Sequence, residues 1–257
     1  MKITFLGTGT SQGVPVIACP CPVCQSTNSK DKRLRTSVLI ENKASTFTID
    51  AGPDFRQQML QYDVKKLDAI LVTHGHKDHV GGMDDIRSFN WLQRKAMPVY
   101  ADAQAAKSIR SEFSYAFSDD KYPGVPNFDL IPITNRVIQI GNSQITPIPL
   151  MHLKLPVHGF RIKDFTYITD ANYIPNDSWK LIEGTKILVI NALRKEKHIS
   201  HFNLEEALKV IEKINPEQAY LTHISHLMGF HKEVEATLPK HVKIAYDGLI
   251  LHIQDEL

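Results

Sequence analysis

His74-Gly75-His76-Lys77-Asp78-His79 follows directly on the β-type run Ala69-Ile70-Leu71-Val72-Thr73. The segment carries three imidazoles and one carboxylate within six residues. Neutral histidines pack poorly in clusters, and an aspartate is seldom buried without a partner. Core packing therefore does not explain this composition, whereas side chains at this spacing after a strand can bind two adjacent cations. The pattern predicts a metal site at the end of a strand.

The composition is that of an ordinary globular protein with no strong charge of either sign. Of the 257 residues, 42% are hydrophobic and 23% are charged, which provides enough apolar material for a sizeable core. Thirty Lys and Arg against 28 Asp and Glu leave a formal net charge of +2. We expect no stable nucleic-acid partner, because proteins that bind duplex DNA carry a concentrated basic surface.

The sequence gives no indication of export or of a membrane anchor. Its first nine residues hold one lysine and only a short apolar run, unlike a secretory signal. No stretch approaches the ~18 apolar residues of a membrane span. We expect no membrane association and a location in the cytoplasm.

Short runs of β-type composition alternate with amphipathic helical patterns along the whole chain. No linker or fixed-period repeat interrupts them, so we expect one α/β domain over residues 1–257. The clearest helical pattern covers residues 204–214, with Asn203 and Glu206 forming its N-terminal cap. Residues 114–127 are expected to form a long surface loop. The other expected helices cover residues 54–62, 84–94, 103–113 and 175–182, and the expected strands cover 2–6, 37–40, 46–49, 69–73, 99–101, 128–132, 144–149, 165–169, 186–190, 218–222 and 249–253.

The His-x-His-x-Asp-His motif, with Thr46-Phe47-Thr48-Ile49-Asp50-Ala51-Gly52 upstream, resembles the metallo-β-lactamase superfamily. The resemblance implies an αββα sandwich, in which two β-sheets are flanked by helices and the metals lie at one edge. It also implies further ligands late in the chain. It assigns one cation to His74, His76 and His152, the other to Asp78, His79 and His223, the bridging position to Asp170, and the orientation of ligands to Asp50.

All three cysteines of the chain lie in Cys19-Pro20-Cys21-Pro22-Val23-Cys24. A disulfide would leave one thiol over and is unexpected in the cytosol. Three thiolates supply three of the four ligands of a tetrahedral structural zinc. We expect His226, in Thr222-His223-Ile224-Ser225-His226, to be the fourth ligand. The alternative is a redox-active or merely reduced thiol cluster.

Four motifs together resemble the PhnP branch of this superfamily, whose namesake is a phosphoribosyl cyclic phosphodiesterase. They are residues 6–15, the C-x-C-x-x-C segment, the His-x-His-x-Asp-His segment and the Thr-His-Ile-Ser-His segment. The resemblance implies a metal-dependent hydrolase that cleaves a small, cyclic phosphodiester. It further implies two divalent metal ions in the active site, which histidine and carboxylate ligands allow to be Zn, Mn or Fe, besides one structural zinc. A homodimer is also expected.

In the expected mechanism, two cations share a bridging hydroxide that attacks phosphorus, and Asp78 takes part in catalysis as one of their ligands. His201 precedes the helix expected at 204–214 and resembles the general acid proposed for the branch; the alternative is an exposed loop histidine. Lys154 is a candidate contact for the substrate phosphate or a solvated surface charge. His158 stays outside the metal set and marks a different pocket at most.

Three other functions remain open at this stage. An RNA-processing nuclease of the same fold would usually need a basic arm or an extra domain, and none is visible. A thioesterase or lactonase would use the same hydroxide on a carbonyl carbon, which the metal ligands do not exclude. A non-enzymatic metal-binding protein is least expected, because it would not need a complete two-metal ligand set.

Overall fold

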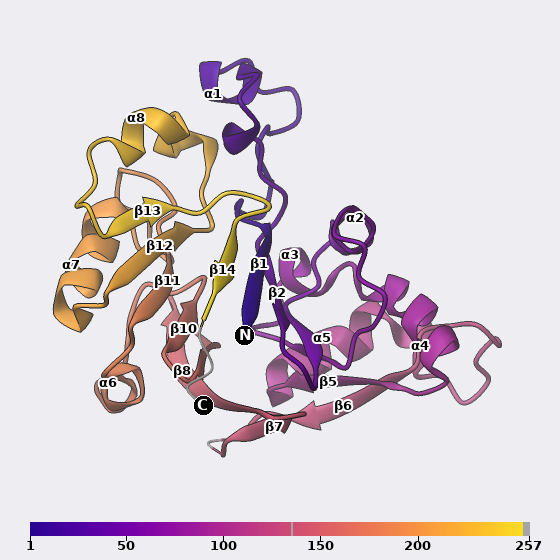
Figure 1. Cartoon of the computed structure of the whole chain (residues 1–257). Coiled ribbons are helices and arrows are strands. Elements are labelled where there is room, and N and C mark those ends of the chain that lie inside the picture. Colours follow the sequence, from indigo (N-terminus) through magenta and orange to yellow (C-terminus); the bar gives the residue numbers. More distant parts are fainter. Residues whose placement is uncertain (135, 254–257) are drawn as a thin grey trace.

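Two β-sheets lie face to face, and helices cover their outer faces (Figure 1). The computed structural model describes residues 1–134 and 136–253. Most strands are apolar on both faces, so each sheet needs cover on both sides, and the helices and the opposite sheet provide it. The αββα sandwich predicted from the sequence is confirmed. That residues 1–257 form one domain stays a prediction.

The first sheet has the strand order β14-β1-β2-β3-β4-β5-β6. Its strands are antiparallel from β14 to β3 and parallel from β3 to β6. The strands are β1 Lys2–Gly7, β2 Ser37–Glu41, β3 Thr46–Ile49, β4 Ala69–Leu71, β5 Met97–Ala101, β6 Phe128–Pro132 and β14 Ile250–His252.

The second sheet repeats this arrangement with the order β13-β12-β11-β10-β9-β8-β7. It is antiparallel from β7 to β10 and parallel from β10 to β13. Because β8 and β10 are both antiparallel to β9, they run in the same direction and end at the same edge of the sheet. The strands are β7 Ile138–Ile140, β8 Ser143–His152, β9 Leu155–Ile162, β10 Phe165–Ile168, β11 Ile187–Asn191, β12 Gln218–Thr222 and β13 Val242–Ile244.

The helices divide between the two outer faces, α2 to α5 on the first sheet and α6 to α8 on the second (Figure 1). One apolar cluster lies beneath each of these two groups of helices. A third apolar cluster lies between the sheets and contains Phe5, Phe47 and Phe160. The helices are α1 Pro22–Gln25, α2 Phe55–Gln61, α3 Lys77–Val80, α4 Arg87–Gln93, α5 Ala103–Glu112, α6 Asn176–Ile182, α7 Leu204–Ile214 and α8 His231–Glu235, and the 3-10 turns are η1 Ser29–Asp31, η2 Met83–Ile86, η3 Ser114–Ala116 and η4 His226–Met228. No helix in the described ranges is long and apolar enough to cross a membrane.

The helix predicted with most support is confirmed together with its cap. The side-chain oxygen of Asn203 accepts a hydrogen bond from the backbone N–H of Glu206 at 2.8 Å. The Glu206 carboxylate accepts one from the Asn203 N–H at 3.1 Å. This reciprocal pair satisfies two N–H groups that the first turn of α7 leaves free.

The sequence patterns do not predict β7, β9, β13, α1, α3 or α8. In β9, Pro156 and Gly159 are residues that strands usually avoid, so the segment does not read as a strand. Gly159 is required there, because an added Cβ would lie 2.9 Å from the Tyr167 carbonyl oxygen. The helix expected at 84–94 is wrong in its first turn, where the 3-10 turn η2 precedes α4. The loop expected at 114–127 begins with the 3-10 turn η3.

Gly52 lets the loop after β3 contact the segment after β4. A Cβ at this position would lie 1.9 Å from the Asp78 carbonyl oxygen. Gly52→Ala should therefore lower the free energy of unfolding by about 1–3 kcal/mol and weaken metal binding, because the backbone of the His74–His79 segment must shift. Denaturant unfolding and metal content measure both effects. Gly124→Ala, where nothing lies within 4 Å of the added Cβ, is the control that adds only backbone strain. A Gly52→Ala protein with unchanged stability and metal content would contradict the packing argument.

Candidate functional site

Strands that run in the same direction carry the candidate ligands to one edge of the sandwich. The segment that starts at His74 follows β4, and Asp50 follows β3. In the second sheet His152 is the last residue of β8, Asp170 follows β10 and His223 follows β12. Residues far apart in the sequence therefore lie in one cluster, as Asp170 and His79 show with 2.5 Å between Oδ2 and Nε2.

Asp170 lies at the centre of this cluster and is almost completely buried. Its Oδ2 is 2.5 Å from His79 Nε2 and 3.7 Å from His74 Nε2. Its Oδ1 is 2.8 Å from His223 Nε2 and 3.1 Å from His201 Nε2. The carboxylate thus faces histidines from both expected ligand sets, which is the position that a bridging ligand needs.

One expected ligand set lies close enough to hold a single cation. Asp78, His79, Asp170 and His223 each offer one ligand atom, and these atoms all lie within 4.8 Å of one another. His223 Nε2 is buried and has no hydrogen bond of correct geometry in the described structure, although Asp170 Oδ1 is 2.8 Å away. Two ligand atoms of the same cation lie close together without a hydrogen bond between them. The spacing of these four residues therefore fits a divalent metal ion.

The other expected ligand set is also assembled. His74 Nε2 is 2.9 Å from His76 Nδ1. The ring of His152 lies with its centroid 5.7 Å from that of His74 and 5.2 Å from that of His76. His76 is exposed whereas His74 is buried, so this set opens to solvent on the side of His76.

Two ligands are held in orientation by hydrogen bonds on the ring nitrogen that points away from the cluster. His79 Nδ1 donates to Asp50 Oδ2 at 2.6 Å, and Thr73 N–H donates to Asp50 Oδ1 at 2.8 Å. His152 Nδ1 donates to the Ser200 carbonyl oxygen at 2.7 Å. Each bond holds a proton on Nδ1, so that Nε2 is the nitrogen that the neutral ring offers as a ligand. Asp50 has the contact that its predicted role requires.

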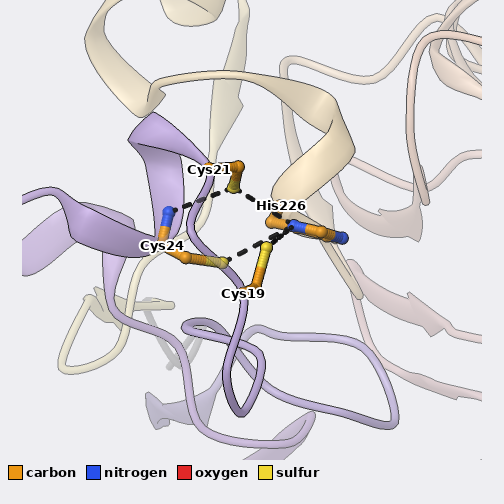
Figure 2. A group of neighbouring side chains, drawn as sticks. All are labelled: Cys19, Cys21, Cys24 and His226. Atoms are coloured by element: carbon orange, nitrogen blue, oxygen red, sulfur yellow. Dashed lines mark hydrogen bonds between the residues drawn. The ribbon is translucent and has the colours of Figure 1, made fainter.

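The three cysteines and His226 form a second, separate group (Figure 2). The sulfur atoms of Cys19, Cys21 and Cys24 lie 3.4, 3.3 and 3.5 Å from His226 Nδ1. Zinc–ligand bonds of tetrahedral geometry place nitrogen and sulfur about 3.5 Å apart, so the spacing fits a structural zinc. The Cys24 N–H donates to Cys21 Sγ and, with His226 nearby, lowers the pKa of the Cys21 thiol to about 6. The cluster is therefore ready to supply a thiolate.

Comparison with known proteins identifies the family. Residues 45–224 match the family model of the beta-lactamase superfamily domain. The crystal structure of a new diphosphatase from the PhnP family is similar over 98% of both chains, with 34% sequence identity and a TM-score of 0.92. The chain belongs to the PhnP family of the metallo-β-lactamase superfamily. The sequence-based prediction of this family is confirmed, and the prediction of a metal-dependent hydrolase agrees with it.

Two curated relatives of this PhnP-family chain are larger proteins. The chain is 38% identical over 252 residues to an octanoyltransferase of Porphyromonas gingivalis, a match of 97% of this chain and 51% of that protein. It is 26% identical over 156 residues to a ribonuclease Z of Methanococcus maripaludis, or 59% of this chain and 46% of that protein. The chain thus spans about half the length of these relatives.

The charges of the cluster suit cation binding. Burial would raise the pKa of Asp170, but the neighbouring His223 and His79 outweigh it and hold this pKa well below its usual range. Burial lowers the pKa of His152 to about 4 and holds the pKa of His74 well below its ordinary value. Burial would lower the pKa values of His79 and His223, but the neighbouring Asp170 and Asp78 outweigh it, raising the pKa of His223 to about 9 and that of His79 well above its ordinary value. A cation at this PhnP-family site would therefore bind the neutral His74 and His152 directly, whereas binding to His79 and His223 would release their protons.

His201 lies beside the central carboxylate, as its predicted role requires, and a second histidine supports it. His201 Nε2 is 3.1 Å from Asp170 Oδ1. His201 Nδ1 is 3.1 Å from His198 Nδ1 and 3.1 Å from Ser200 Oγ. His198 is not among the site residues predicted from the sequence, although a second histidine three residues before His201 in the same loop could have indicated it. The role of His201 as general acid stays a prediction.

Lys154 lies in the turn between β8 and β9, and His158 lies within β9. Lys154 is exposed in the turn, so its contact with substrate stays a prediction. The His158 N–H donates to the Thr73 carbonyl oxygen at 2.9 Å, and His158 Nδ1 lies 3.6 Å from Asp102 Oδ2. The His158 ring therefore lies near the aspartate that caps α5, without a hydrogen bond at Nδ1 in the described structure. That His158 stays outside the metal set remains a prediction.

His223 and His226 lie three residues apart but belong to different clusters, which makes their variants a sharp comparison. His223→Ala should abolish catalysis and keep the cysteine-bound zinc, because His223 contacts only the active-site group. His226→Ala should lose that zinc and lower the melting temperature, since binding energy at a structural site is also folding energy. Zinc content and thermal unfolding distinguish the two. If His226→Ala keeps its zinc and its melting temperature but loses activity, the assignment of His226 is wrong.

Proposed function

We propose that this chain is a metal-dependent phosphodiesterase that hydrolyses a small, cyclic phosphodiester, with two divalent ions held at the edge of the sandwich. The observation that carries the proposal is the position of the Asp170 carboxylate, between the histidines of both expected ligand sets. Histidine and carboxylate donors accept Zn, Mn or Fe. The structural zinc is proposed to lie between the cysteines and His226.

The relatives support chemistry at phosphorus. The PhnP-family structure that resembles this chain is a diphosphatase, and the Methanococcus relative is a ribonuclease, so both names describe hydrolysis at phosphorus. The formal net charge of only +2 favours a small substrate over a long polyanion. The homodimer stays a proposal that rests on the family alone.

The residues of the site would have three roles in such a reaction: binding the cations, orienting the ligands and donating a proton. Divalent ions bound by these donors would lower the pKa of a bound water towards neutrality and neutralise charge on the phosphoryl oxygens. Asp50 and the Ser200 carbonyl oxygen hold His79 and His152 in position. His201, which lies 3.1 Å from Asp170 Oδ1, would give a proton to the leaving oxygen.

A second candidate is hydrolysis of an acyl ester or thioester. The specific observation in its favour is the 38% identity to an octanoyltransferase, whose name describes transfer of an acyl group. The match covers 51% of that protein, so the name can belong to its other half. The phosphodiesterase is preferred because the diphosphatase is similar over 98% of both chains.

Metal content and turnover of a substrate panel test the proposal. The purified protein should contain two active-site metal ions and one zinc per chain. It should hydrolyse ribose cyclic phosphate, 2′,3′-cyclic nucleotides or bis(p-nitrophenyl) phosphate, lose this activity on chelation and regain it with added metal. An octanoyl thioester should react far more slowly. Fast thioester hydrolysis without phosphodiester turnover would support the second candidate, and a fully metallated protein inactive on every substrate would indicate a metal-binding protein.

His201→Ala tests the proposed proton donor. Turnover of a diester with an alkoxide leaving group should fall by roughly 10²–10⁴-fold, because the alkoxide needs a proton to depart. A p-nitrophenyl ester should be affected far less, since p-nitrophenolate departs without help. Steady-state kinetics on both substrates gives the comparison, with His241→Ala, a histidine before β13, as the control. Equal losses on both substrates would point to binding or folding instead.

A further inference from the structure

Three large apolar side chains are exposed beside the ligand cluster. The exposed fractions of Leu153, Tyr173 and Ile199 are 51%, 54% and 73%. Scattered exposed apolar residues are ordinary on protein surfaces, whereas a group at one place marks a binding surface. We call these three residues the apolar rim.

Each residue of the apolar rim is a near neighbour of a residue of the site in sequence. Leu153 directly follows His152. Tyr173 lies three residues after Asp170, and Ile199 lies two residues before His201. The rim therefore borders the side of the cluster where His201 meets the central carboxylate.

Asn172 joins the three segments of the rim. Its side-chain oxygen accepts a hydrogen bond from the Leu153 N–H at 2.7 Å, and its amide donates to the Ile199 carbonyl oxygen at 3.0 Å. The Met151 N–H donates to the Tyr173 carbonyl oxygen at 3.0 Å. Leu153, Tyr173 and Ile199 thus extend from one hydrogen-bonded unit, although they come from three different loops.

Hydrogen bonds to two neighbouring carbonyl oxygens fix the backbone at Ile199. The next residue, Ser200, accepts the hydrogen bond from His152 that orients this ligand, at 2.7 Å. A shift of the backbone at residues 199 and 200 would therefore break the bond that orients His152, besides the bond from Asn172. The exposed side chain of Ile199 therefore extends from a backbone segment that is hydrogen-bonded to the expected metal ligand His152.

We propose that the apolar rim binds an apolar substituent of the substrate while the metal site binds its phosphate. The proposal rests on the proposed phosphodiesterase function and narrows its substrate class to phosphodiesters that carry a nucleobase or an alkyl chain. Burial of either group against Leu153, Tyr173 and Ile199 would remove apolar surface from water and so strengthen binding. The rim is a specificity surface, and the three residues have no part in the bond-breaking step.

Three five-membered cyclic phosphates with alkoxide leaving groups test this proposal. Glycerol 1,2-cyclic phosphate carries no apolar group, 2′,3′-cyclic AMP carries a planar base, and 1-O-octylglycerol 2,3-cyclic phosphate carries an alkyl chain. The wild-type protein should prefer one of the last two over the first by about tenfold in kcat/KM, the effect of covering roughly 60 Å² of apolar surface. Which of the two is preferred identifies the source of the apolar group.

Variants of the rim locate the preference. Ile199→Ser, Tyr173→Ser and Leu153→Asn should each reduce the preference ratio, and the triple variant should bring it close to one. Asn is chosen for Leu153 because the backbone there has a φ of 57°, which Asn tolerates. Leu92→Ser is the matched control, since Leu92 is 74% exposed on α4 and should keep the wild-type ratio. Metal content and melting temperature are measured for every variant.

The kcat/KM values for the three substrates test the apolar rim and the proposed phosphodiesterase function separately. Equal kcat/KM for all three substrates in the wild type, or a ratio that the triple variant keeps, would overturn the apolar rim while the phosphodiesterase stands. A triple variant that loses rate equally on all three substrates would also overturn it, because that pattern indicates a role in the reaction itself. Absence of turnover on every cyclic phosphate by metallated protein would overturn the proposed function and the rim with it.

Discussion

The buried carboxylate of Asp170 is the constraint on which the rest of the site depends. Taking an ion out of water costs on the order of several kcal/mol, so a buried carboxylate must be surrounded by opposite charge or hydrogen-bond donors. Here His79 and His223 approach it within 2.5 and 2.8 Å from the two sheets. Asp170 and His223 also adopt left-handed backbone, with φ of 53° and 56°, a strain that proteins concentrate at functional sites. A divalent cation would satisfy the whole group at once.

Two sets of contacts connect the N-terminal part of the chain to its C-terminal part near this site, and each is called a tie. The cysteines near the N-terminus meet His226, three residues after the ligand His223. A second tie is the buried Arg33, whose Nη1 donates to Thr8 Oγ1 at 2.8 Å and to the Ala245 carbonyl oxygen at 2.6 Å. The first tie holds the segment after β12, and the second holds the segment after β13, against the loop between β1 and β2. A structural zinc bound by the cysteines and His226, as proposed, would therefore support the active site without taking part in the reaction.

Sequence reasoning succeeds where chemistry and strand ends coincide. The His74 to His79 segment is an unusual cluster directly after a β-type run, and the resemblance to the family assigns His152, Asp170 and His223 to the same site, so their meeting at one edge could be predicted. It fails where tertiary contact alone gives a residue its importance. Asn172 is ordinary in sequence, and its bonds to Leu153 and Ile199 exist only because three loops meet. The Ser200 carbonyl, which orients His152, carries no side-chain signal at all.

In the proposed function, the carboxylate of Asp170 would bind two cations. Anomalous X-ray diffraction from crystals of the metal-loaded protein, recorded above and below the absorption edges of Zn and Mn, tests it directly. The account predicts two peaks about 3.5–4 Å apart at the edge of the sandwich, each about 2.0–2.2 Å from an oxygen of Asp170. A single peak there, or two peaks of which only one contacts Asp170, would contradict it.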